Sequence, residues 1–228
     1  DTMKGFKEMG FLPEAFINML ALLGWNDGTE QEIFSMDELV KKFSIDRVHS
    51  SGAKFDYEKA KWFNHEWIKK SNSDRLLEPV RDFFTEKGII INDHKKLVKV
   101  IDLVKERCTL LTDFLEQADF FFVTPTQIDT ISILTKWNQN KNLFFNELIR
   151  SYQLTELTNA VEFENVFKEI SAINQLKPGE LMLPFRIMLV GSKHGPAVFD
   201  IASILGKEET IKRIEHGLSM LNQAQKVG

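Results

Sequence analysis

Residues 93–111 read Asp-His-Lys-Lys-Leu-Val-Lys-Val-Ile-Asp-Leu-Val-Lys-Glu-Arg-Cys-Thr-Leu-Leu, and this stretch decides the class of the fold. Its apolar residues share a narrow arc when successive residues are turned by about 100° around a helix. Arg107 lies at the border of that arc, where its stem can pack while its guanidinium stays accessible. The stretch predicts an amphipathic helix, with a buried stripe formed by Leu97, Ile101, Val104, Cys108 and Leu111.

Proline and glycine mark the bounds of several further helices. Proline fits the first position of a helix, where its missing N–H is not needed, and glycine fits the position after the last. Helices of this kind are expected at Pro13–Leu23, Pro79–Lys87, Pro184–Val190 and Pro196–Leu205. Arg186 would then lie in a first helical turn, where its guanidinium adds to the positive end of the helix.

Capping residues mark other helix starts. Ser35 and Glu38 have the spacing of a capping box, in which each side chain accepts a backbone N–H. Asp56 is the expected cap of a helix that runs to Lys70. Thr-Pro-Thr-Gln at residues 124–127 combines a capping box with proline at the first helical position, so it predicts both a helix start and a domain boundary.

The rest of the chain also reads as helical. Three helices are expected between Ile128 and Ile173, with breaks at residues 138–142 and near Thr155, and a last one from about Lys207. The alternation that is typical of β-strands is nowhere sustained. The fold class is therefore predicted to be all-α.

Composition excludes several kinds of protein. The 228 residues allow one large domain or a few small ones. One cysteine and five scattered histidines favour neither disulfides nor a metal site. No stretch approaches the roughly 18 apolar residues of a membrane span, and no signal peptide is evident, so we expect a cytoplasmic protein. The start at Asp1 suggests a fragment of a longer protein.

The net charge of −4 argues against a broad surface for nucleic acid, which is usually basic. The charges are unevenly distributed, because residues 41–70 are rich in lysine and arginine whereas residues 1–40 and 112–170 are mostly acidic. A local basic face and ordinary solvated helix faces explain this pattern about equally well.

Common enzyme signatures are absent from the sequence. It contains no Gly-x-x-x-x-Gly-Lys-Ser/Thr phosphate loop, no Gly-x-Gly-x-x-Gly dinucleotide fingerprint and no Gly-x-Ser-x-Gly nucleophile elbow. No pair of carboxylates lies in an evident apolar setting. We therefore expect no catalytic residue in this chain.

Several blocks of sequence stand in a recognisable order and spacing. They are Gly-Phe-Leu-Pro-Glu-Ala at 10–15, Leu-Ala-Leu-Leu-Gly-Trp at 20–25, Ser-Gly-Ala-Lys-Phe-Asp at 51–56, Lys-Trp-Phe-Asn at 61–64, Leu-Pro-Phe-Arg at 183–186 and Leu-Gly-Lys-Glu at 205–208. Together they resemble the C-terminal half of bacterial-type glutamyl-tRNA synthetases, which are class I enzymes. The middle, about 112–175, matches that family poorly in residue type.

The resemblance implies a helical stem-contact domain at residues 1–70 and two helical anticodon-binding subdomains at residues 71–123 and 124–228. The parent enzyme would attach glutamate to tRNA(Glu) with ATP and Mg²⁺. The motifs of its catalytic domain, of the His-Ile-Gly-His and Lys-Met-Ser-Lys-Ser types, are not present here. This chain would then be a monomer that binds tRNA(Glu) and needs no cofactor of its own. It would be inactive without the N-terminal catalytic domain.

The resemblance also implies site residues. Arg107 falls where the family places an arginine that reads the last anticodon base. In this family an arginine at that position is associated with rejection of tRNA(Gln). Arg186, Pro196 and Val198 match positions beside the anticodon. The candidates for contacts with tRNA backbone phosphates are Lys54, Lys59 and Lys61.

Two other interpretations remain open at this point. One is the helical tRNA-binding region of a class I lysyl-tRNA synthetase, although the Leu-Gly-Trp and Leu-Gly-Lys-Glu blocks favour the glutamyl enzyme. The other is a helical protein-interaction scaffold without a role in RNA binding, which would bind its partner without the steep salt dependence of phosphate contacts.

Overall fold

The computed structural model describes residues 5–48 and 54–227, and their regular secondary structure is helical. No strand occurs among these residues, and one isolated antiparallel bridge joins Trp25 to Val48. The predicted all-α class is confirmed. Three residues of the Ser-Gly-Ala-Lys-Phe-Asp block, at 51–53, lie outside the described part of the chain.

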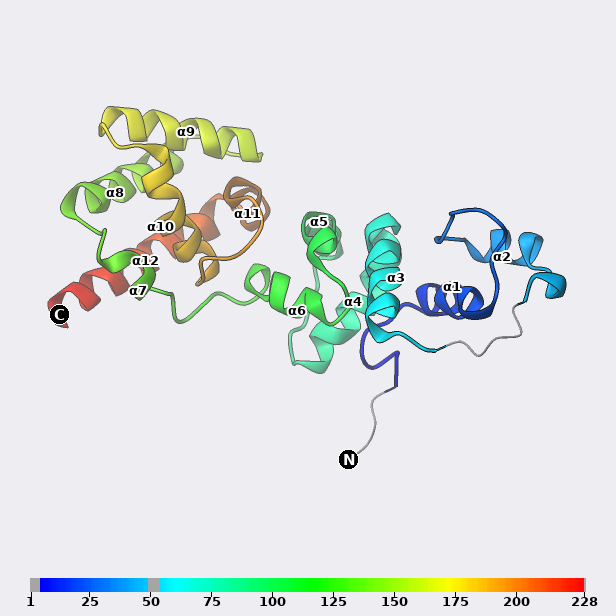
Figure 1. Cartoon of the computed structure of the whole chain (residues 1–228). Coiled ribbons are helices and arrows are strands. Elements are labelled where there is room, and N and C mark those ends of the chain that lie inside the picture. Colours follow the sequence, from blue (N-terminus) through cyan, green and yellow to red (C-terminus); the bar gives the residue numbers. More distant parts are fainter. Residues whose placement is uncertain (1–4, 49–53, 228) are drawn as a thin grey trace. The chain divides into compact units, whose positions relative to one another are not determined.

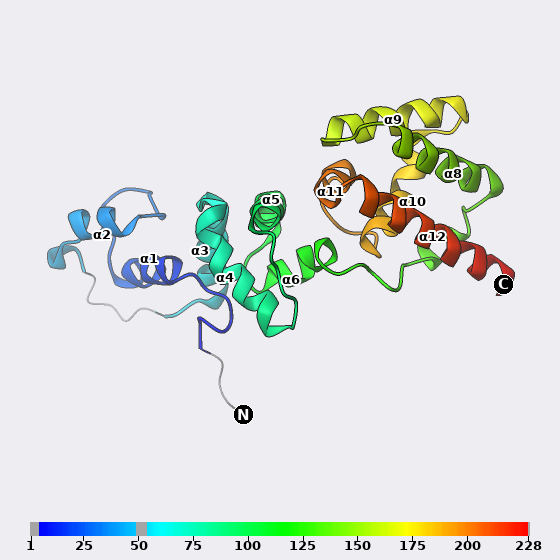
Figure 2. The ribbon, with the colours of Figure 1, turned by 180° about the vertical axis from the view of Figure 1, so that it is seen from behind.

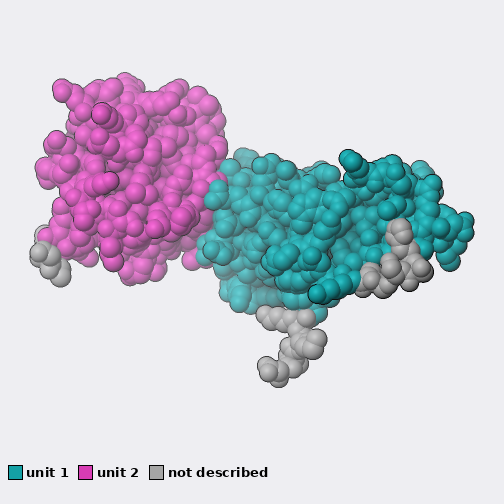
Figure 3. All heavy atoms as spheres, in the orientation of Figure 1, with its two compact units in different colours: residues 1–119 teal, residues 120–228 magenta. Residues whose placement is uncertain are grey.

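The chain divides into two compact units, residues 1–119 (unit 1) and residues 120–228 (unit 2) (Figure 3). Each unit has its own buried core, and each is described here by itself. The finer division of the chain at residues 70 and 123 stays a prediction.

Unit 1 is built from helices that pack in pairs, α1 against α3 and α4 against α5 (Figure 1). Its helices are α1 (Pro13–Gly24), α2 (Met36–Lys42), η1 (Ile45–Arg47), α3 (Tyr57–Lys70), α4 (Ser73–Glu86), α5 (His94–Val104), η2 (Lys105–Arg107) and α6 (Asp113–Ala118), and the short η3 (Asp119–Phe121) spans the unit boundary.

Local capping explains where several of these helices begin. The Ser35 hydroxyl accepts the Glu38 N–H, and the Glu38 carboxylate accepts the Ser35 N–H at 2.8 Å, which completes the predicted capping box. Asp56 caps α3 by accepting two backbone N–H groups, as expected. Pro13 is the first residue of α1.

Two buried asparagines tie the elements of unit 1 together. Asn64 on α3 accepts the Leu12 N–H at 2.7 Å and donates to the Thr109 carbonyl at 2.7 Å. Asn18 on α1 accepts from the Phe34 N–H and from the indole of Trp67. Because buried amides are costly without partners, these bonds fix one arrangement of α1, α3 and the adjacent loops.

The stripe predicted between residues 93 and 111 is buried, but the helix is shorter than the pattern suggests. All five stripe residues are at most 4 % exposed. However, α5 ends at Val104 and continues only as the tighter turn η2. The Asp113 carboxylate accepts the Thr109 and Leu110 N–H groups, so a side chain replaces the helical partners that a longer helix would need.

Unit 2 packs around an aromatic core. The ring centroid of Phe167 lies 5.2 Å from that of Phe185 and 5.3 Å from that of Phe199. Helix α9 packs against α8 and α11, while α12 packs against α8 and α10 (Figures 1 and 2). The helices are α7 (Ile131–Leu134), α8 (Gln139–Leu154), α9 (Ala160–Ile173), α10 (Pro178–Val190), α11 (Val198–Leu205) and α12 (Lys207–Val227). Three helices occur before Ile173 as expected, but the break predicted at residues 138–142 is wrong, because α8 begins at Gln139.

Two prolines lie inside helices that they were expected to start. Helix α4 begins at Ser73, because the Asn72 side chain caps it, and Pro79 falls within it. Helix α10 begins at Pro178 and encloses Pro184. A proline inside a helix removes one backbone hydrogen bond, and at Pro184 the loss is offset by burial among apolar neighbours.

The helix predicted to start at residues 124–127 does not form there. The Thr124 hydroxyl donates to Glu209 on α12 at 2.7 Å instead of capping a turn. The Asp129 N–H donates to the Gly191 carbonyl at 2.8 Å. With these tertiary bonds the segment does not form a helix, and the four-residue α7 begins only at Ile131.

Candidate nucleic-acid interface

Arg107 ends η2 and is exposed. Its Nε donates to the side-chain oxygen of Gln117 on α6, at 3.1 Å. Among the described residues no ion pair or further hydrogen bond involves this guanidinium. Its two terminal Nη groups are therefore available to donate in parallel to an acceptor edge.

Arg186 is half-buried in the second half of α10, which corrects the expectation that it lies in a first turn. The helix begins eight residues earlier than Arg186, at Pro178, so the positive end of α10 is not near this side chain. The Arg186 Nη1 donates to the backbone carbonyl of Pro196. Glu209 forms an ion pair with Arg213 at 2.7 Å and not with Arg186.

Pro196 and Val198 are buried beside this bond, and Val198 is only 1 % exposed. Val198 is the first residue of α11, so a ligand there would meet its backbone N–H rather than its side chain. The adjoining loop also carries the exposed residues Ser192, Lys193 and His194, none of which is among the predicted site residues.

The three candidate lysines differ in how far they are already engaged. Lys59 forms an ion pair with Glu32 and lies over the ring of Trp62, at 5.3 Å. Lys61 pairs with Glu58 at 2.8 Å, and this hydrogen bond raises the pKa of its ammonium group. Lys54 is exposed and forms no ion pair with any residue that the structure describes. Lys54 is therefore the candidate most available to a phosphate.

The structure brings only some of the predicted residues together. Arg186 contacts the Pro196 backbone directly, and Val198 follows two positions later. Lys59 and Lys61 share α3 but pair with carboxylates on different elements. Gln117, the partner of Arg107, was missed because a contact across ten residues and a turn leaves no periodic signal in the sequence.

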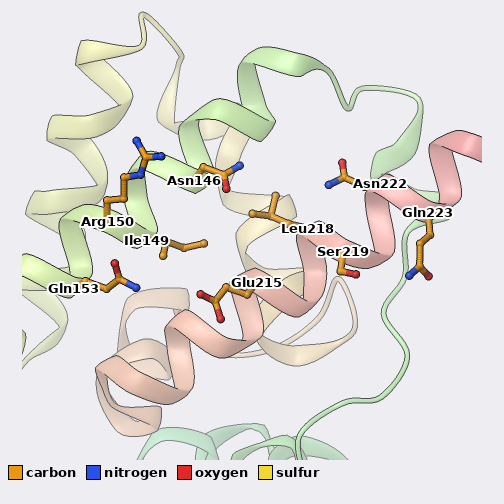
Figure 4. Close-up of a pocket in the computed structure, with 9 residues that line it drawn as sticks. All are labelled: Asn146, Ile149, Arg150, Gln153, Glu215, Leu218, Ser219, Asn222 and Gln223. Carbon is orange, nitrogen blue, oxygen red and sulfur yellow. The ribbon is translucent and has the colours of Figure 1, made fainter.

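A cavity of about 610 Å³ lies between α8 and α12 (Figure 4). None of the predicted site residues is among the residues that line it. Four of its nine lining residues are amides, and Gln153 and Glu215 point toward one another across it. Arg150 and Glu215 contribute opposite charges, so this cavity offers no concentrated positive potential to a phosphate.

Cys108 is fully buried, and this burial raises the pKa of its thiol to about 12. The thiol is therefore protonated near neutral pH and packs as a small apolar group. Within residues 5–48 and 54–227, no three or more His, Cys, Asp or Glu side chains gather in a way that could hold a metal ion. The same ranges contain no helix of the length and apolarity that crossing a membrane requires.

Comparison with known proteins identifies relatives of both parts of the chain. The family model described as "Anticodon binding domain" matches residues 75–218. The model of the catalytic domain of class I tRNA synthetases (E and Q) matches residues 1–62, within the region expected to be a stem-contact domain.

Individual relatives match nearly the whole chain. The glutamate–tRNA ligase of Flavobacterium psychrophilum is 42 % identical over 221 residues, which are 96 % of this chain and 44 % of that protein. The one from Porphyromonas gingivalis W83 is 39 % identical, over 97 % of this chain and 44 % of its own length. The chain thus spans less than half the length of these relatives.

A solved structure also matches. The crystal structure of a glutamate tRNA ligase from Elizabethkingia meningosepticum, in complex with its amino acid, gives a TM-score of 0.88 at 35 % identity. The match covers 97 % of this chain and 44 % of that one. The same helical architecture therefore occurs in a longer protein with related sequence.

Proposed function

Because the chain belongs to the anticodon-binding domain family, we propose that it is the part of a glutamate–tRNA ligase that binds tRNA(Glu) and reads its anticodon. The observation that carries this proposal is the extent of the family match. It includes all four candidate anticodon residues, which are Arg107, Arg186, Pro196 and Val198.

The chemistry of Arg107 suits discrimination between two tRNAs. In the standard code, anticodons of tRNA(Glu) end in C and those of tRNA(Gln) end in G. An unpaired cytosine presents the adjacent acceptors N3 and O2, to which the Nη groups of Arg107 can donate in parallel. A guanine presents N–H donors on the corresponding edge, which would face the guanidinium donors without a hydrogen bond.

The loop held by Arg186 supplies the second part of the proposed site. Splayed anticodon bases are normally bound by edge contacts and by packing against side chains. The Pro196 carbonyl is fixed by Arg186, and the backbone N–H of Val198 opens α11. This arrangement would present backbone groups to a base, while Lys54, Lys59 and Lys61 contact phosphates elsewhere on the tRNA.

The activity of the whole enzyme is part of the proposal. The parent would activate glutamate with ATP and Mg²⁺ and transfer it to tRNA(Glu). We assign ATP and Mg²⁺ to the rest of the parent and no cofactor to this chain, which alone should bind tRNA without charging it. A monomeric chain and a cytoplasmic location follow from the same resemblance.

The relatives favour the glutamyl over the lysyl interpretation, because those compared are glutamate–tRNA ligases. The scaffold interpretation differs in its response to salt. Phosphate contacts release counterions, so tRNA binding should weaken steeply as salt rises, whereas apolar docking of a protein should not.

Fluorescence-anisotropy titration tests the proposed function. The chain is titrated with labelled tRNA(Glu), tRNA(Gln) and an unrelated tRNA at two salt concentrations. We expect salt-sensitive binding that favours tRNA(Glu). Equal binding of all three tRNAs would contradict anticodon reading by this chain, and binding that ignores salt would contradict phosphate contacts.

A further inference from the structure

The backbone that carries Arg107 is held in place from several directions. The His65 ring nitrogen Nδ1 lies 2.9 Å from the Cys108 carbonyl oxygen. Asn64, on the same helix α3, donates to the Thr109 carbonyl at 2.7 Å. The side chain of Cys108 itself is fully buried. The position from which the Arg107 side chain leaves the backbone is therefore fixed by its neighbours.

The turn after Arg107 is held just as firmly. The Asp113 carboxylate accepts the Thr109 N–H at 2.8 Å and the Leu110 N–H at 2.9 Å. Gln117 lies four residues after Asp113 on α6 and therefore on the same face of that helix. This geometry brings the Gln117 amide oxygen within 3.1 Å of the Arg107 Nε.

An exposed arginine samples many rotamers, and ordering it on a ligand costs conformational entropy. A hydrogen bond at Nε restricts the plane of the guanidinium while leaving both Nη groups free to donate. We propose that Gln117 is a positioning residue that holds Arg107 in the orientation needed to distinguish anticodon bases. This inference rests on the proposed function, since it concerns the same site.

The residue type at position 117 suits this role. The amide oxygen of glutamine is a single neutral acceptor and takes one N–H of the guanidinium. A carboxylate at this place could bind Nε and one Nη together, because arginine and carboxylate commonly pair through two parallel bonds. That pairing would remove one of the two donors that a base edge requires and would neutralise the arginine.

A double-mutant cycle in the whole 228-residue chain tests this positioning role of Gln117. The variants are Gln117→Met, Arg107→Ala and the double variant, each titrated with tRNA(Glu) and tRNA(Gln). Methionine keeps the length of the side chain and removes the strong acceptor. The matched control is Gln153→Met, the same substitution on α8 of unit 2. Melting temperatures are recorded for all variants.

We expect Gln117→Met to reduce the ratio of the two affinities by about threefold to tenfold, the range of one hydrogen bond. The melting temperature and the control ratio should stay unchanged, and the double variant should be no less selective than Arg107→Ala. An unchanged ratio in Gln117→Met beside a reduced ratio in Arg107→Ala would overturn the positioning role alone. An unchanged ratio in both variants would overturn the reading of the anticodon by Arg107 as well.

Discussion

Arg186 donates a hydrogen bond from Nη1 to the backbone carbonyl of Pro196, which links the middle of α10 to the loop before α11. Gly195 adopts φ +152°, and a Cβ at this position would lie 3.2 Å from the same Nη1. The loop therefore depends on both residues. Arg186 donates the hydrogen bond, and Gly195 leaves room for its guanidinium because it has no side chain. Arg186 thus shapes the proposed anticodon site as well as adding charge to it.

Replacement of Arg186 by Met should release the Pro196 carbonyl and weaken binding of tRNA(Glu). A lost hydrogen bond from a charged group corresponds to a weakening of about tenfold to 150-fold. Anisotropy titration measures the affinity. Lys193→Met serves as a control, because it removes a positive charge from the loop before α11 without breaking the bond between Arg186 and the Pro196 carbonyl. Equal effects of the two substitutions would show that only charge matters.

Replacement of Arg107 by Lys should keep the charge but lose the planar fork of donors. We expect overall affinity to change little, while the preference for tRNA(Glu) over tRNA(Gln) falls by about fivefold or more. Competition binding with the two tRNAs provides the measurement. Full retention of the preference by lysine would mean that a point charge suffices and that no parallel hydrogen bonds are formed.

Replacement of Lys54 by Ala should weaken binding of both tRNAs alike. It should also reduce the magnitude of the slope of log K against log salt concentration by about 1. The same change at Lys59 should have a smaller effect, because its ammonium is already paired with Glu32. Glu32→Gln should then strengthen binding by freeing Lys59. A selective effect of Lys54→Ala on one tRNA would argue against a phosphate contact.

Arg213 on α12 is 2 % exposed, pairs with Glu209 and donates to the Leu189 carbonyl at 2.6 Å. Arg213→Met should lower the free energy of unfolding of unit 2 by about 1–3 kcal/mol, since it removes the hydrogen bonds to the partly buried Glu209 carboxylate and to the Leu189 carbonyl. Urea unfolding monitored by circular dichroism measures this change. The double variant with Glu209→Leu should recover much of the loss, and a further loss would contradict the reason given.

Asp27 in unit 1 accepts from the Lys42 ammonium at 2.7 Å and from the Thr29 hydroxyl, and these bonds lower its pKa from 3.8 to about 2. Since the folded-state pKa is depressed, the stabilising contribution is present above about pH 4 and is lost as the pH falls toward 2. Asp27→Asn should flatten this part of the stability curve in thermal melts between pH 5 and pH 2. An unchanged curve would contradict the assignment.

Local signals predicted the structure where local bonds decide it. Ser35 and Asp56 cap their helices as their spacing suggests, since a cap needs only its own first turn. Thr124 has the same kind of signal but binds Glu209, which is distant in sequence, so the expected helix does not start there. Pro184 was misleading because Pro178 provides the earlier start, and burial holds the longer helix.

The same distinction applies to the candidate site. The resemblance provided Arg107 and Arg186 by position, because a motif preserves residue type and spacing. The contacts that orient them, with Gln117 and with the Pro196 carbonyl, depend on how a turn and a loop fold back. Such contacts follow from the tertiary structure, and no periodicity in the sequence indicates them.

We propose that this chain reads the last anticodon base through Arg107. The most direct measurement compares tRNA(Glu) with a variant that carries G instead of C at that base, titrated against the unmodified chain and Arg107→Ala. We predict that the single base change weakens binding to the unmodified chain by about fivefold to 150-fold and has little effect on Arg107→Ala. Equal affinities of the unmodified chain for both tRNAs would contradict the claim.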